Sequence, residues 1–422
     1  MSQIYNFEKY SSKVFKLRDF LSMLQDDRKE PDINIQKIVL GYYFGSALRM
    51  KATSEIEEET RNGVLKKRVG AISDDTIGYG LEHLRTESIQ EGWYMLGRRA
   101  KRNGMLRDSP FDDYIVGVLD GIETYSSYNR KCNNCLTRKV TVKVEGKGKG
   151  KKGKKVKKTQ YYHKTVVLTL VGYDFPIPIG LEMMRKGEDE VKCAQRLLER
   201  IVNKLGVRFL DIVICDALYC TPNFFKACKK LGIHAGAVLK ANQENLLESA
   251  RSQTKITKPV ITEETDKEKL KLWDLGEIFW DTADRDVRVI WADREVWERD
   301  ESSKEKSSHW VEKRKVFAFS KEIDHLSTKV VYSIGRHRWD IDAKTFMDMG
   351  KHWHLKHKTL HFPKAYENML SIRFIAYFAF MFFFYRHINS RRKEKIKSYI
   401  EMARKLYRSA CDNPEPETIL LE

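Results

Sequence analysis

The chain has 422 residues, enough for two or three domains with sizeable cores. Lysine and arginine (78 residues) outnumber aspartate and glutamate (59), so the formal net charge is +19. Such an excess suits a polyphosphate partner but sets no reaction class. Residues 1–19 are polar and mixed in charge, which argues against a secretory signal. Seven cysteines without such a signal indicate a reducing compartment rather than a disulfide framework.

Residues 1–110 are predicted to form a helical domain. Long apolar patches occur at 33–50, and Ser73 opens a polar N-cap cluster before an apolar run at 77–84. A basic cluster at 98–107 then leads into Pro110. Two interpretations stay open for this domain, a role in DNA binding and a purely structural helical cap.

Two short apolar runs, 113–119 and 209–215, are each followed by an aspartate, Asp120 and Asp216. Runs of this length bounded by turn residues are typical of buried strands. A carboxylate just past the C-terminal end of a strand lies where open α/β sheets usually place their chemistry. Neither position is decisive alone, because aspartate also follows strands as an ordinary turn residue.

Further elements are predicted around these two runs. We expect strands at 164–171, 175–183 and 233–239, and helices at 188–205 and 223–231. Residues 146–158 contain eight lysines and almost no apolar side chain, so they are predicted to form a flexible loop. This loop is either a solvated hairpin extension or a sequence-independent clamp on a DNA backbone.

Residues 241–331 are predicted to be β-rich, with strands at 287–292 and 316–319. The segment holds five of the eight tryptophans in the chain. Tryptophans in a small β segment more often belong to its core, although base–aromatic stacking would permit one of them to contact DNA.

The most apolar run, 374–385, has 12 residues, whereas a membrane span needs about 20. It is therefore predicted to be a core helix that covers the sheet, and no membrane association is expected. Residues 389–422 are predicted to form a basic C-terminal helix and tail. That helix presents either a solvated face or a surface for DNA or a partner subunit.

The most informative motif begins at Arg338 and Trp339. Its helix has an apolar stripe with i, i+3, i+7 spacing, at Phe346, Met349 and Trp353. A carboxylate at the start of such a helix suits a divalent cation, and nearby arginine and lysine suit phosphate. Asp340 and Asp342 both lie at this start. Residues two apart on a helix do not share a face, and the register favours Asp342.

Together with Asp120 and Asp216, this motif resembles the catalytic residues of bacterial insertion-sequence transposases of the DDE, cut-and-paste type with the YREK signature. The resemblance covers about residues 111–385. It implies an α/β fold with a ribonuclease-H-like core at 111–240 and 332–388. A β-rich insertion at 241–331 would precede the third acidic residue, and the helical domain at 1–110 would precede the core. The chain departs from the signature at Gly335, Asp342 and Gly350, where the family has tyrosine, glutamate and lysine.

The resemblance implies a DNA transposase that cleaves transposon ends and transfers the strand into target DNA. Asp120, Asp216 and Asp342 would hold two Mg²⁺ or Mn²⁺ ions, with Asp120 shared. The phosphate contacts would come from Arg338, Lys351 and Lys240. The partners would be double-stranded DNA, as terminal repeats and target, and a second copy of the chain when DNA is bound. The expected location is the prokaryotic cytoplasm, at the nucleoid. Two alternatives stay open, a catalytically silent DNA-binding relative and a ribonuclease-H-like nuclease without strand transfer.

Cys132 and Cys135 form a Cys-x2-Cys pair, and this spacing can chelate zinc. His163 or Cys220 would add ligands. No second pair of matching spacing exists, so a structural zinc site competes with an ordinary pair of reduced cysteines. A group of three histidines lies in the signature helix region and is expected to serve packing or DNA contact: His352, His354 and His357.

Overall fold

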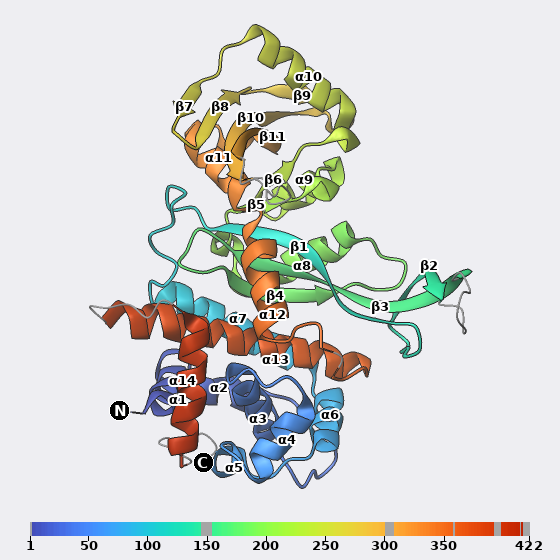
Figure 1. The fold of residues 1–422 in the computed structure, drawn as a ribbon, viewed down its shortest axis with the longest axis vertical. Helices are drawn as coiled ribbons and strands as arrows, with labels where there is room; N and C mark the ends of the chain where they lie inside the picture. Colours follow the sequence, from blue (N-terminus) through green and yellow to red (C-terminus); the bar gives the residue numbers. More distant parts are fainter. Residues whose placement is uncertain are drawn as a thin grey trace.

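One large mixed sheet runs through the upper part of the protein, and helices fill the lower part (Figure 1). The computed structural model describes residues 2–144, 154–299, 308–357, 359–391, 398–413 and 415–416. Within these ranges the strands follow the order β2-β3-β1-β5-β6-β11-β10-β8-β7, with β4 paired to β3 and β9 to β10. The result is a mixed α/β fold with one large mixed sheet.

The first six strands form the half of the sheet that carries the site. Their bounds are β1 (Val116–Ser127), β2 (Leu136–Val144), β3 (Lys154–Leu170), β4 (Ile177–Met183), β5 (Ile212–Cys215) and β6 (His234–Val238). β3 is antiparallel to β1, β2 and β4, whereas β1, β5 and β6 are mutually parallel. All four residues of β5 are buried, as expected for a central parallel strand covered on both faces.

Five more strands extend the same sheet rather than forming a separate β unit. They are β7 (Ile261–Glu264), β8 (Glu268–Asp274), β9 (Ile278–Trp280), β10 (Arg285–Arg299) and β11 (Ser308–Ser320). β11 pairs antiparallel with β6, with Phe317 opposite Val238. The segment 241–331 is β-rich as predicted, and it also contains helix α10 (Glu244–Ile256).

The lower part consists mainly of the N-terminal helices (Figure 1). These are α1 (Gln3–Val14), α2 (Leu17–Ser22), α3 (Ile35–Ala47), α4 (Thr53–Arg61), α5 (Lys66–Val69), α6 (Asp74–His83) and α7 (Thr86–Arg102). The predicted cap is present, because Ser73 Oγ accepts a hydrogen bond from the N–H of Thr76. The domain boundary at residue 110 stays a prediction.

Helix α13 (Pro363–Phe382) lies between these helices and the sheet (Figure 1). It continues into a π-helical turn, η7 (Phe383–Ile388), and packs against α3, α6, α7 and β4. The helix is long and apolar enough to cross a membrane, but 94% of its most apolar window is buried inside the protein. Its apolarity therefore reflects its place as a core helix. Helix α14 (Tyr399–Asp412) packs on α1.

Two helices pack on the site half of the sheet, and their caps explain where they start. Asp189 caps α8 (Glu190–Leu205), and Thr221 caps α9 (Pro222–Lys230). Both helices were predicted from the sequence, at 188–205 and 223–231, and the structure confirms them. Before α13 the chain forms helix α11 (Thr328–His337), the π-helical η6 (Ile341–Phe346) and helix α12 (Met347–His352). Short 3₁₀ turns complete the chain: η1 (Val207–Phe209), η2 (Ala217–Tyr219), η3 (Ala241–Gln243), η4 (Asp281–Ala283), η5 (Lys321–Ile323) and η8 (Asn389–Arg391).

The first strand differs from its prediction in a way that matters for the site. Asp112 and Asp113 have positive φ angles of 52° and 65°, so the strand starts only at Val116. It then continues to Ser127, and Asp120 lies within it, opposite Val167 of β3. The prediction that Asp120 follows the end of its strand was therefore wrong.

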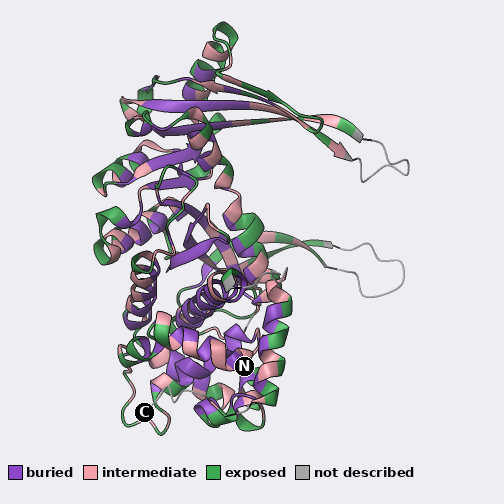
Figure 2. Cartoon of the chain, turned by 90° about the vertical axis from the view of Figure 1, so that its left-hand side faces the viewer, coloured by how far each residue is buried: buried purple, intermediate pink, exposed green. Residues whose placement is uncertain are grey.

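The lysine-rich stretch is also partly ordered. Residues 154–158 belong to β3 and pair with residues 140–144 of β2, so the predicted loop is shorter than 146–158. Residues 146–153 lie outside the described part of the chain. In Figure 2 the β2–β3 hairpin and the β10–β11 hairpin project from the same side of the molecule. We call them the β2–β3 arm and the β10–β11 arm.

Candidate active site

Asp120 is positioned by the middle of the sheet. It lies in β1 between β3 and β5, and only 8% of the residue is exposed. The N–H of Gly121 donates a hydrogen bond to Asp120 Oδ1 (2.8 Å). One carboxylate oxygen is thus held by the backbone, and Oδ2 faces the site.

Asp216 follows β5, as predicted. Val118 pairs with Ile214 across the parallel β1–β5 ladder, and Asp120 and Asp216 each lie two residues further along. Asp216 opens the η2 turn, where the N–H of Leu218 donates to its Oδ1 (2.8 Å). The parallel register therefore places both carboxylates at one edge of the sheet, each with one oxygen anchored.

Arg338 joins the third carboxylate to the first two. It ends α11, and Asp342 lies four residues later in η6, a spacing that places both side chains on one face. Arg338 Nη1 donates to Asp342 Oδ2 (2.7 Å) and Nη2 donates to Asp120 Oδ2 (3.1 Å), with Asp216 Oδ2 at 3.9 Å. Asp340 instead pairs with Lys344 Nζ at 2.9 Å. The structure thus gathers the three predicted acids around one guanidinium.

The electrostatics of this cluster favour a cation. Burial raises the pKa of Asp120 to about 7; Arg338 opposes the rise, and the charges of Asp342 and Glu190 add to it. One buried guanidinium faces three carboxylates, so negative charge is in excess. Carboxylate oxygens are the ligands that Mg²⁺ and Mn²⁺ prefer, and this donor set fits such ions.

A fourth acid, Glu190, was missed by the sequence reasoning. It is the first residue of α8 and is buried, where it accepts a hydrogen bond from Tyr219 Oη (2.9 Å) and pairs with Lys164. A Cβ atom on Gly121 would lie 2.5 Å from the Glu190 carboxyl carbon and 2.7 Å from Lys164 Cε, so the glycine leaves room for this ion pair. No local signal distinguishes Glu190 from an ordinary acidic first-turn residue.

Two further basic side chains, Lys240 and Lys315, lie near Arg338. Lys315 of β11 places its Nζ 4.1 Å from the centre of the Trp339 ring. Burial lowers the pKa of Lys315, and the positive charges of Lys240 and Arg338 lower it further, which shows that these three cations lie near one another. Lys240 was predicted, whereas Lys315 was missed because a lysine in a strand carries no special pattern.

Lys351 is exposed on α12. Within the described residues, the structure records no hydrogen bond or ion pair between Lys351 and the three acids. The backbone carbonyls of two nearby histidines accept hydrogen bonds, His352 from Arg49 Nε (2.9 Å) and His354 from Arg373 Nη1 (2.7 Å). A role of the histidine side chains in packing or DNA contact stays a prediction.

The five tryptophans of 241–331 differ in burial: two are buried, two are partly buried and one is exposed. Trp280 and Trp291 are buried in the core. Trp297, at 43% exposure, lies on the β10–β11 arm with its ring centre 5.3 Å from that of Trp310. Exposure leaves Trp297 free to contact a partner, whereas the buried pair has a packing role.

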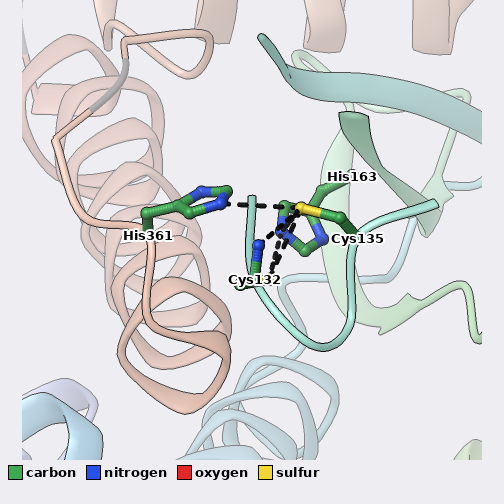
Figure 3. Close-up of side chains that lie close together, drawn as sticks. All are labelled: Cys132, Cys135, His163 and His361. Atoms are coloured by element: carbon green, nitrogen blue, oxygen red, sulfur yellow. Dashed lines mark hydrogen bonds between the residues drawn. The ribbon is translucent and has the colours of Figure 1, made fainter. Parts of the chain in front are cut away.

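A second cluster lies at the base of the β2–β3 arm (Figure 3). It brings together Cys132, Cys135 and His163, as predicted, and adds His361, which was missed. His361 is 226 residues from Cys135 in sequence, so no spacing rule could have paired them. Cys220, the other predicted ligand, is buried elsewhere and does not belong to the cluster.

Comparison with known proteins places this geometry in context. Residues 138–379 match the family described as the transposase DDE domain. The matched segment contains Asp216 and Asp342 and begins after Asp120. Among solved structures, the chain is similar to a piggyBac transposase in its synaptic complex with hairpin DNA, determined by cryo-EM. The identity is 12% and the TM-score 0.43, over 98% of this chain and 80% of that chain. No curated protein matches the chain.

Proposed function

Because the chain belongs to the transposase DDE domain family, we propose that it is a metal-dependent enzyme that cleaves transposon ends and transfers the strand into target DNA. The observation that carries this proposal is the convergence of Asp120, Asp216 and Asp342 on Arg338. The four-residue spacing of Arg338 and Asp342 supports the finer assignment to the bacterial insertion-sequence group with the YREK signature. A prokaryotic cytoplasmic location at the nucleoid is part of the same proposal.

Asp120, Asp216 and Asp342 would hold Mg²⁺ or Mn²⁺, and we assign Asp120, the most buried of the three, to both ions. Ions bound by these carboxylates would activate the attacking oxygen and neutralise the leaving oxygen of an in-line displacement. Arg338 balances the carboxylates and is the side chain best placed to contact a phosphate beside them. Lys240 and Lys315 extend this cationic edge. Lys351, which lies on helix α12, would contact the DNA backbone away from the scissile bond.

The two arms provide a surface for double-stranded DNA. The β2–β3 arm has six exposed cations in its described strands: Arg138, Lys139, Lys143, Lys155, Lys157 and Lys158. No acidic residue lies in 136–143 or 155–160, so the arm attracts phosphate along its length. Both arms project on the same side (Figure 2). We propose that they hold terminal-repeat or target DNA, and that two copies of the chain pair on DNA because two transposon ends must be joined.

A second candidate function is a DNA-binding relative without catalysis. It is favoured by the shorter acid at position 342, which is engaged by Arg338 at 2.7 Å. A nuclease that cleaves without strand transfer is the other alternative within the same chemistry. Products distinguish the three functions: joined DNA supports a transposase, cut DNA alone a nuclease, and bound but intact DNA a silent relative.

The test uses the full chain, DNA carrying the element's flanking terminal repeats, a target plasmid, and Mg²⁺ or Mn²⁺. Asp216→Ala is expected to abolish cleavage and joining, because it removes a metal ligand, while binding to the repeats stays within about threefold because the arms are unchanged. Asp340→Ala is the matched control, since this acid lies beside the site but pairs with Lys344. Normal turnover by Asp216→Ala would refute the site assignment.

A further inference from the structure

Four side chains at the base of the β2–β3 arm offer metal-ligating atoms to one point (Figure 3). The ligand atoms of Cys132, Cys135, His163 and His361 all lie within 4.8 Å of one another. The two sulfurs are 3.5 Å apart. His163 Nε2 lies 3.3 Å from Cys132 Sγ and 3.5 Å from Cys135 Sγ, and His361 Nε2 lies 3.5 Å from Cys135 Sγ. This is a Cys₂His₂ donor set.

These separations match the edges of a zinc tetrahedron. With Zn–S bonds of about 2.3 Å and Zn–N bonds of about 2.05 Å, tetrahedral angles give S···N edges of about 3.6 Å and S···S edges of about 3.8 Å. The one S···S distance and three of the S···N distances are 3.3–3.5 Å, slightly shorter than these ideal values, and the remaining ligand atoms lie within 4.8 Å of one another. The side chains are therefore already arranged as the ligands of one small cation.

Hydrogen bonding alone does not account for this arrangement. Cys135 Sγ lies within 3.5 Å of four other donor or acceptor atoms, and a thiol has a single hydrogen to donate. Cys135 and His163 are also almost fully buried, so water cannot satisfy the remaining contacts. The Nδ1 atom of His361 is buried without a hydrogen-bond partner among the described residues, which leaves Nε2 as the polar anchor of this ring.

The surroundings fix the ligands in place. The N–H of Cys132 donates to Cys135 Sγ (3.3 Å), an interaction that stabilises negative charge on the sulfur. The ring of Tyr125 lies 4.4 Å from that of His361, and Tyr366 of α13 stacks on His163 at 5.1 Å. Both imidazoles are thus oriented by packing before any metal binds.

We propose that Cys132, Cys135, His163 and His361 bind one structural zinc ion that fastens the base of the β2–β3 arm to the start of α13. The cysteines lie in the connection between β1 and β2, His163 lies in β3, and His361 precedes the first residue of α13 by two positions. Four protein ligands leave no open position, which is typical of structural rather than catalytic zinc. The ion would connect Cys132 and Cys135 to His361, which lies more than 200 residues later in the chain. It would thereby fix the position of the basic β2–β3 arm relative to the core. This proposal is independent of the proposed catalysis.

Metal content and spectroscopy of the untagged full chain test the site. After passage over a chelating resin, mass spectrometry of the metal is expected to find one zinc per chain. Co²⁺ exchanged into the protein should give the visible bands of a tetrahedral ion with thiolate ligands. His361→Ala should weaken zinc binding at least about 100-fold in competition with a chromogenic chelator, because even outer-sphere changes cost about 10–100-fold.

Matched variants separate ligation from folding and from the acidic site. His361→Cys should retain zinc with an altered Co²⁺ spectrum, since Cys₃His is also a zinc ligand set. Cys411→Ser changes an exposed cysteine outside the cluster and should retain it as well. Asp216→Ala should keep one zinc per chain, which distinguishes this ion from one bound at the three acids.

Three results would overturn the proposal. One is a wild-type chain that contains no zinc and takes up no tetrahedral Co²⁺. The second is an unchanged zinc affinity in His361→Ala. The third is a Cys132–Cys135 disulfide in protein purified under reducing conditions.

Discussion

Asp120→Asn is expected to stabilise the fold while it removes catalysis. The Asp120 carboxylate is buried beside the negative charges of Asp342 and Glu190, and its pKa is raised from 3.8 to about 7 despite Arg338. Near neutral pH the folded protein therefore retains a proton that the unfolded chain releases. Asparagine keeps the shape of the side chain without the charge. The substitution should therefore remove the free-energy cost of burying this charge, which the wild-type protein retains because the site needs a carboxylate.

The magnitude follows from linkage. A raised carboxyl pKa in the folded state means that stability falls as pH rises from about 4 to about 7, and stays low above pH 7. At 1.36 kcal/mol per pH unit, a pKa rise from 3.8 to about 7 costs the wild type about 4 kcal/mol at pH 8 and about 2 kcal/mol at pH 5. The stabilisation by Asp120→Asn should therefore grow by about 2–3 kcal/mol between pH 5 and pH 8.

Urea unfolding at pH 5, 6, 7 and 8, without added divalent cations, measures this difference. Asp340→Asn is the control: it removes a surface ion pair with Lys344 and should change the free energy of unfolding by less than about 1 kcal/mol. Addition of Mg²⁺ should stabilise the wild type and not Asp120→Asn, because only the wild type keeps the ligand. A destabilised Asp120→Asn at pH 8, or a difference that does not change with pH, would refute the reasoning.

Two further predictions concern the third acid and the arm. In Asp342→Glu, joining activity in Mg²⁺ should hold within about threefold or rise. The family has glutamate at this position, and the Asp342 side chain is half-exposed, so there is room for the longer acid. A loss of more than about tenfold would show a site adapted to aspartate. Replacing the lysines of the β3 part of the arm with glutamine should reduce the salt dependence of DNA binding by about 0.9 in logarithmic slope for each phosphate that the arm no longer neutralises. The variant changes Lys155, Lys157 and Lys158, and the matched control changes Lys226, Lys229 and Lys230 of α9. An equal fall in slope in both variants would remove the arm from the DNA interface.

Local patterns in the sequence were sufficient for the separate elements. Apolar runs bounded by turn residues predicted β5 with Asp216 directly after it, and helical periodicity predicted α8. The length and apolarity of 374–385 predicted the core helix that α13 and η7 form. Helical spacing also favoured Asp342 over Asp340, and only Asp342 contacts Arg338 in the structure. These features depend on interactions within a few residues, so one stretch of chain contains the information.

Pairing between distant segments decided the rest. Asp120 lies inside β1 rather than after it, because β3 continues alongside the strand to Ser127. Residues 154–158 have almost no apolar side chain, yet they extend as a strand because β2 pairs with them. Among the described residues, the strands of 241–331 join the central sheet through the ladder between β6 and β11. Such pairings depend on backbone hydrogen bonds, which any side chain permits, so composition does not reveal them.

The acidic cluster and the Cys₂His₂ cluster were also predicted only in part from the sequence. The sequence by itself identified the chemical types, three carboxylates with an arginine and a Cys-x2-Cys pair with a histidine. Only the tertiary structure brought Glu190 to Asp120, Lys315 to Arg338 and His361 to the cysteines. A side chain's chemistry is a property of its residue, whereas its neighbours across the fold depend on how β1, β3, α8 and α13 pack, and that packing depends on the whole chain.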